Sequence, residues 1–164
     1  GDHRDLHLSL RRQRQMCIRD SLYKEKFTRV PYSGAFVGGS NIIRINDLTE
    51  AQTRSFKGDL IPPETFPKIV FEAKHYANFQ WNALALGKSV AQLDEWIQQS
   101  EESCEAKDKW LLCVKISRQG SFVLWDHTQW MDLNFSHTYR DKYQYLEFAD
   151  FWNTNSRQIK EQSV

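Results

Sequence analysis

The sequence predicts a single domain of the α/β class. The chain has 164 residues and is about 40% apolar, which is enough for one domain with a substantial core and too little for two. Its apolar segments follow the order strand, strand, helix, strand, strand, which is typical of α/β folds. Six Trp, six Tyr and ten Phe residues supply enough apolar surface to offset the entropy lost on folding.

The first part of this domain is expected to contain short strands and loops. Residues 21–39 read as the end of a helix or a turn followed by a loop, because Pro31 and nearby glycines break regular structure. "NIIRI" at 41–45 is a strand candidate, and residues 46–57 form a polar connection. "GDLI" at 58–61 predicts a brief strand that ends at two prolines.

The segment "KIVFEAK", residues 68–74, predicts a strand with two different faces. Successive side chains of a strand point to opposite sides. One face carries Ile69, Phe71 and Ala73, and the other carries Val70, Glu72 and Lys74. The alternation therefore places Glu72 and Lys74 side by side.

The second half of the sequence supplies the predicted helix and further strands. Residues 82–102 have apolar side chains at helical spacing, and Gly87 is expected to weaken the first turn without breaking it. "KWLLCVKI" at 109–116 and "GSFVLW" at 120–125 predict buried strands. Residues 145–160 carry aromatic side chains at helix-like spacing before a polar end.

Charge and cysteine content set limits on function. The net charge of +1 means that binding to a polyanion would depend on local groups of Lys and Arg. The three cysteines have no C-x-x-C spacing, so neither a disulfide framework nor a zinc site is indicated and a reducing compartment is expected. The most apolar run, 109–116, is far shorter than the roughly 20 residues that span a bilayer. No contact with a membrane is therefore predicted.

Residues 1–21 differ in composition from the rest of the chain. "GDHRDLH" and "RRQRQMCIRDS" resemble the in-frame translation of a transposon-type sequencing adaptor, with residues 8–10 at the position of a sample index. We expect residues 1–21 to be a non-native tail. Residues 22–164 are then expected to form one domain that is truncated at its N-terminus.

Three residues suit metal-assisted hydrolysis of a phosphodiester. Asp59 and Glu72 are oxygen donors of the kind that Mg²⁺ prefers. Lys74 can hold or help to deprotonate an attacking water and balance charge that develops on phosphorus. The alternative is that an acid-x-Lys triplet on a strand is a solvated face with a weak ion pair.

Five segments in order resemble a known superfamily. "RVPYSGA", "KGDLIPP", "FEAK", "AQLDEWIQQ" and "WLLCVKI" are similar to segments of PD-(D/E)XK nucleases, and most of all to archaeal and phage Holliday junction resolvases. The resemblance covers roughly residues 27–118. It implies a restriction-endonuclease-like fold, in which a mixed β-sheet is flanked by helices.

The resemblance also implies roles for individual residues. Asp59, Glu72 and the backbone carbonyl of Ala73 correspond to ligands of Mg²⁺ or Mn²⁺, and Lys74 corresponds to the catalytic lysine. Arg29, Ser33 and Lys115 correspond to residues of the family that contact DNA. Lys57 and His75 are further DNA-contact candidates, because Lys57 lies close to Asp59 in the sequence and His75 directly follows Lys74. The alternatives are that Lys115 only marks a strand end, that Lys57 is a solubilising lysine, and that His75 is an incidental exposed histidine. The family usually has a further glutamate on an N-terminal helix, and the suspected adaptor occupies the region that should contain it. This copy is therefore open to the alternative that it binds DNA without cutting it.

The function predicted from these residues is a Mg²⁺-dependent endodeoxyribonuclease that resolves four-way DNA junctions. A homodimer is expected, since a symmetric junction needs two cuts. The predicted location is the cytoplasm of a prokaryotic or phage-infected cell. The alternatives are a nuclease of the same superfamily that acts on linear duplex or single-stranded DNA, and an inactive DNA-binding relative.

Two further pairs of residues have suggestive spacing. Gln92 and Trp96 are separated as in a Gln-x-x-x-Tyr signature, but Trp96 is better explained as a core residue and Gln92 as solvated. Asp126 and His127 are adjacent, but without a third ligand or a nucleophile they predict a loop or strand edge rather than a catalytic or metal site.

Overall fold

The computed structural model describes Thr28–Arg29, Leu60–Ile61 and residues 69–162. Several predictions concern residues outside these ranges. They are the tail 1–21, the strand candidate 41–45, and the site residues Ser33, Lys57 and Asp59.

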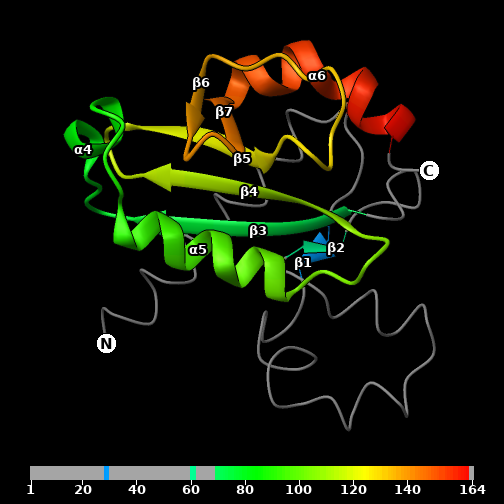
Figure 1. Cartoon of the computed structure of the whole chain (residues 1–164), viewed down its shortest axis with the longest axis horizontal. Helices are drawn as coiled ribbons and strands as arrows, with labels where there is room; N and C mark the ends of the chain where they lie inside the picture. Colours follow the sequence, from blue (N-terminus) through cyan, green and yellow to red (C-terminus); the bar gives the residue numbers. More distant parts are fainter. Residues whose placement is uncertain (1–27, 30–59, 62–68, 163–164) are drawn as a thin grey trace, which may run out of the picture.

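The fold is α/β, with a mixed sheet flanked by helices, as the sequence predicts (Figure 1). The described strands form one seven-stranded sheet in the order β1-β2-β3-β4-β5-β7-β6. Their bounds are β1 Thr28–Arg29, β2 Leu60–Ile61, β3 Ile69–Tyr76, β4 Lys109–Ile116, β5 Gly120–Asp126, β6 His137–Tyr139 and β7 Tyr143–Glu147. The pair β3 and β4 is parallel, and the other neighbours are antiparallel.

Two helices connect the parallel strands β3 and β4. Parallel neighbours need a crossover connection, and this one contains α4 (Trp81–Ala85) and α5 (Ala91–Glu102). The third described helix, α6 (Phe148–Gln162), follows β7 and packs on the other side of the sheet (Figure 1).

The sheet separates two apolar cores. On one face, Phe71 and Leu111 of the sheet pack with Trp152 of α6. On the other face, Val70 and Leu112 pack with Trp96 of α5. Odd- and even-numbered residues of β3 thus face different helices, which confirms the alternation predicted for residues 69–74.

Three sequence predictions need correction. The predicted helix 82–102 is two helices, because Gly87 has a φ of +66° and cannot continue a right-handed helix. The helix predicted from the aromatic spacing in 145–160 begins only at Phe148, since the preceding residues pair with β5 and β6 as strand β7. Thr28–Arg29, expected in a turn or loop, is a short strand paired with β2.

None of the helices in the described part of the chain has the length and apolar content that a membrane crossing requires.

Candidate functional site

Glu72 and Lys74 lie on the face of β3 that α5 covers. Residues 69–73 of the strand are buried, so Glu72 lies within the buried part and Lys74 lies directly after it. Their side chains are 6% and 18% exposed, and Lys74 Nζ lies 3.7 Å from Glu72 Oε2. An ionised carboxylate at this depth needs partners that replace water, and the structure provides them.

The C-terminal half of α5 provides those partners. Lys74 Nζ donates a hydrogen bond of 2.6 Å to Gln99 Oε1. Ser103, immediately after the helix, has one hydroxyl proton to share between two acceptors, the carbonyl of Gln99 at 2.8 Å and Glu72 Oε1 at 3.3 Å. The carboxylate and the ammonium are therefore each held from α5 as well as by one another.

Gln99 and Ser103 were not predicted from the sequence. The pair Gln92 and Trp96 has the same spacing of four residues, but Trp96 is 1% exposed in the core, as expected. The available signal was that Gln99 and Ser103 flank the apolar stripe of α5 at i and i+4, so both can reach one neighbouring strand. The sequence does not show that this neighbouring strand is β3, because that depends on how α5 packs on the sheet.

The connection between β6 and β7 fixes the first turn of α5. The hydroxyl of Tyr139 donates to Asp94 Oδ1 at 2.7 Å and accepts a bond of 2.8 Å from the backbone N–H of Val90. Arg140 Nη2 lies 2.6 Å from Asp94 Oδ2. The unsatisfied N–H groups at a helix start require such acceptors, and Tyr139 supplies one here from a distant segment.

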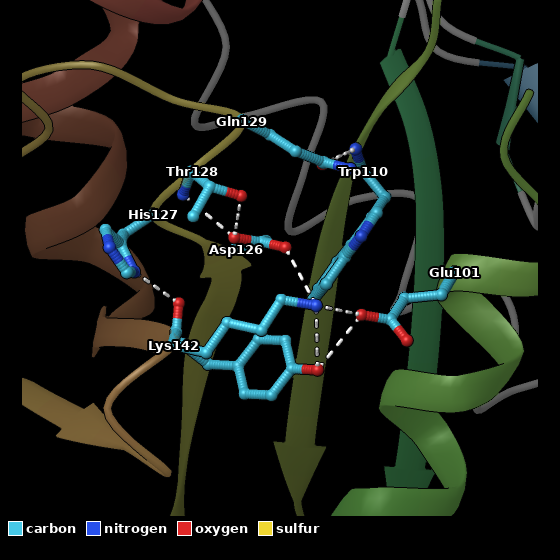
Figure 2. Close-up of polar contacts among 8 residues, drawn as sticks. Glu101, Trp110, Asp126, His127, Thr128, Gln129 and Lys142 are labelled. Atoms are coloured by element: carbon cyan, nitrogen blue, oxygen red, sulfur yellow. Dashed lines mark hydrogen bonds and ion pairs between the residues drawn. The ribbon is translucent and has the colours of Figure 1, made fainter. Parts of the chain in front are cut away.

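The last turn of α5 is fixed by Lys142 (Figure 2). Lys142 Nζ lies 2.8 Å from Glu101 Oε1 and 3.2 Å from Asp126 Oδ2. Tyr143 donates its hydroxyl to the same Glu101 oxygen at 3.0 Å. This network joins α5, the end of β5 and the start of β7. Both ends of the helix that carries Gln99 are therefore held, on the same face of the sheet, by the strands beyond β4.

Asp126 is the buried member of this network, at 4% exposure. Burial raises the pKa of the Asp126 carboxyl, but hydrogen bonds from the hydroxyl and backbone N–H of Thr128, together with Lys142, outweigh burial and lower the pKa below its usual value. The pKa of Lys142 is raised, chiefly by its hydrogen bond to Glu101. Both groups are charged at neutral pH.

Asp126 and His127, adjacent at the end of β5, contact different groups. Asp126 ends β5 and is used by Thr128 and Lys142, whereas His127 is exposed and its Nδ1 lies 2.6 Å from the carbonyl of Lys142. Within the described residues no group of three or more His, Cys, Asp or Glu side chains is arranged to hold a metal ion. The sequence interpretation of this pair as a strand edge is confirmed for Asp126, which is the last residue of β5.

Of the predicted DNA-contacting residues, His75 and Lys115 have described side chains, and both lie on the face of the sheet opposite Glu72 and Lys74. They are register partners on β3 and β4. His75 Nε2 lies 2.9 Å from the hydroxyl of Ser117. Arg29 lies in β1, two strands from β3 in the sheet.

The chemistry of the donors fits part of a site for a hard divalent cation. Mg²⁺ is usually bound by one or two carboxylates together with water and substrate oxygens. Glu72 supplies one carboxylate, and Ala73 a backbone carbonyl from the same strand. Asp59 directly precedes Leu60 in the sequence, and Leu60 pairs with Phe71, the neighbour of Glu72.

The geometry agrees with the comparison with known families. No curated protein and no solved structure matches the chain. A family model described as "Phage putative PDDEXK endonuclease" matches residues 18–161, which is most of the chain and includes β3, α5, β4 and nearly all of α6. The chain therefore belongs to this family of PD-(D/E)XK endonucleases.

Proposed function

We propose that this protein is a metal-dependent DNA endonuclease whose reaction centre is formed by Glu72 and Lys74. The observation that supports the proposal best is the pair itself: a buried carboxylate and a nearly buried ammonium 3.7 Å apart on one strand face, each with a partner on α5 or directly after it. A solvated surface pair would not have this burial. The alternative of an exposed acid-x-Lys triplet is therefore disfavoured.

Each residue has a distinct role in this proposal. Glu72, the carbonyl of Ala73 and Asp59 would hold Mg²⁺ or Mn²⁺, which supplies Lewis-acid activation of the phosphodiester and of water. Lys74 orients the attacking water and balances the negative charge of the pentavalent phosphorus. Gln99 positions the ammonium of Lys74, because the side-chain oxygen of Gln99 accepts a hydrogen bond from Lys74 Nζ at 2.6 Å.

We further propose that the substrate is a four-way DNA junction and that the protein acts as a homodimer. Support comes from the ordered resemblance of five segments to junction resolvases, and from the two symmetric cuts that a junction needs. Arg29, Ser33 and Lys57 are the proposed contacts to the DNA backbone near the reaction centre. A guanidinium is well suited to gripping phosphate oxygens through two hydrogen bonds.

The experiment is cleavage of an end-labelled four-way junction, and of a linear duplex with the same arm sequences, by the full chain with Mg²⁺ or with EDTA. Paired symmetric cuts in the junction, lost in EDTA, support the whole proposal. Equal cleavage of the duplex contradicts junction specificity and supports the linear-DNA alternative.

Calorimetric titration with Mn²⁺ tests the metal role separately. We expect Glu72→Gln to abolish binding and Glu102→Gln, an exposed glutamate on α5, to leave it unchanged. Junction binding without metal binding or cleavage would instead support an inactive DNA-binding protein.

A further inference from the structure

Tyr76 is an exposed aromatic residue at the end of the catalytic strand. It is the last residue of β3 and shares the face of Glu72 and Lys74 by strand alternation. Two residues along a strand span about 6.8 Å, which equals about two base steps of stacked DNA. A DNA strand that runs along β3 with a phosphate at Lys74 would therefore place a nearby nucleotide at Tyr76.

The ring of Tyr76 is held in place although it is exposed. It is 43% exposed, and its other side packs on Trp96 of α5, with ring centroids 4.8 Å apart. Phe79 stacks on the same indole at 5.8 Å and 17°. The backbone carbonyl of Tyr76 accepts a bond of 2.9 Å from the N–H of Ser117, which fixes the strand end. Such a ring presents a π face without a large loss of side-chain entropy on binding.

Polar groups that suit a nucleobase follow Tyr76 in the chain and lie in the turn after β4. Phe79–Ala83, a few residues after Tyr76 in the sequence, line a surface hollow of about 540 Å³. Among them, Gln80 and Asn82 are exposed amides. Arg118, exposed in the turn after β4, is next in sequence to Ser117. Amides can bond the edges of a base, and a guanidinium can bind a phosphate.

We propose that Tyr76 stacks on an unstacked nucleobase of the DNA, one or two nucleotides from the phosphate that is cut. An aromatic side chain can stack only where the DNA offers an open base face, such as a branch point or a single strand, because the bases of a regular duplex already stack on each other. Tyr76 thus selects DNA with disrupted stacking at the cleavage position. This inference rests on the proposed DNA-cleaving function.

The test measures binding of the full chain, by fluorescence anisotropy in EDTA, to a four-way junction and to a linear duplex. Tyr76→Leu keeps an apolar cover on Trp96 but has no π face, and Tyr76→Phe keeps the ring. Met131→Ala is the matched control, because Met131 is an exposed apolar residue, at 71%, outside the sheet face of β3. Thermal unfolding of each variant verifies that it is folded.

Tyr76→Leu is expected to weaken junction binding about 5- to 150-fold, the range measured for one lost base stack. Duplex binding should change less than about twofold, and Tyr76→Phe and Met131→Ala should match the wild type. 2-Aminopurine at the branch point, whose fluorescence falls on stacking, should be quenched by the wild type and not by Tyr76→Leu.

Unchanged junction binding by Tyr76→Leu, or equal losses for junction and duplex, would overturn the inference. If the wild type cleaves DNA with Mg²⁺ while Tyr76→Leu binds normally, only this inference fails. A wild-type chain that binds neither DNA overturns the proposed function as well.

Discussion

Replacing Lys142 by Met is expected to destabilise the protein by about 2 to 3 kcal/mol. The change removes the ammonium that lies between Glu101 and Asp126 (Figure 2). The ion pairs of Lys142 with Glu101 and with Asp126 contribute unequally to the free energy of unfolding, because the two carboxylates differ in exposure. Lys142 and Glu101 are 46% and 38% exposed, so their pair is worth only about 0 to 1 kcal/mol.

Asp126 accounts for the larger part of the loss. Its side chain is 6% exposed, and a buried charge left without its partner costs about 3 to 5 kcal/mol when nothing replaces it. Two hydrogen bonds from Thr128 remain, and Lys142 is half exposed, so we assign about 2 kcal/mol to this side. For a chain of this size the total corresponds to a decrease in Tm of about 5 to 10 °C.

Urea unfolding followed by circular dichroism measures the effect, and the double variant Asp126→Asn with Lys142→Met identifies its cause. If the cost is an uncompensated carboxylate, the double variant should lie within about 1 kcal/mol of the wild type, since the side-chain carbonyl of the asparagine would still accept bonds from Thr128 without a charge. A cost of less than about 0.5 kcal/mol for Lys142→Met alone, within the range of an ordinary surface change, would show that the Asp126 carboxylate does not depend on Lys142. A double variant as unstable as the single one would show that the uncompensated carboxylate is not the cause of the loss.

The pH dependence has a definite sign. The pKa of Asp126 is lowered in the folded protein, so its contribution is present above the usual aspartate pKa of about 3.9 and is lost as the pH falls through the folded value. Without Lys142 that folded pKa rises. The difference between wild type and Lys142→Met should therefore be full at about pH 6 and shrink as the pH falls below about 4.

Other predictions concern the helix and its contact with the strand. Gln99→Leu should lower the cleavage rate by up to about 100-fold, because the ammonium of Lys74 loses the partner that positions it. The same change should cost about 1.5 to 3 kcal/mol in the free energy of unfolding, the worth of a hydrogen bond to a charged group. Gln98→Leu, one residue away and exposed, is the control, and equal cleavage rates for the two variants would contradict the role of Gln99. Gly87→Ala should cost about 1 to 2 kcal/mol in the free energy of unfolding measured with urea, because the φ of Gly87 is +66°, which strains any residue with a Cβ. The added Cβ would meet no atom within 4 Å, so backbone strain is the expected cause. An unchanged stability would show that the connection between α4 and α5 has another conformation.

Patterns that depend only on neighbouring residues were predicted correctly. The alternation in 68–74 places Glu72 and Lys74 on one face, and the structure confirms it through their contacts with α5 and Ser103. The strands predicted at 109–116 and 120–125 are β4 and β5, because continuous apolar runs of this length suit a sheet covered on both faces.

Features that depend on distant partners were not predictable in the same way. A helical pattern continues through Gly87 in the sequence, whereas the backbone turns there to bring α5 back across β3. Asp126 looked like an acid at a strand edge, and its role follows from Lys142, which is distant in sequence. The selection of Gln99 over Gln92 likewise depends on how α5 is positioned, and the β6–β7 connection sets that position.

Glu72 and Lys74 are proposed to perform the cleavage chemistry. This role is tested by the single-turnover rate of Mg²⁺-dependent cleavage of a labelled junction by the wild type, Lys74→Met and Lys107→Met, where Lys107 is an exposed lysine outside the sheet. We predict a loss of at least about 100-fold for Lys74→Met, the scale of general acid–base catalysis, with junction binding retained and Lys107→Met unchanged. Cleavage by Lys74→Met at the wild-type rate would contradict the account.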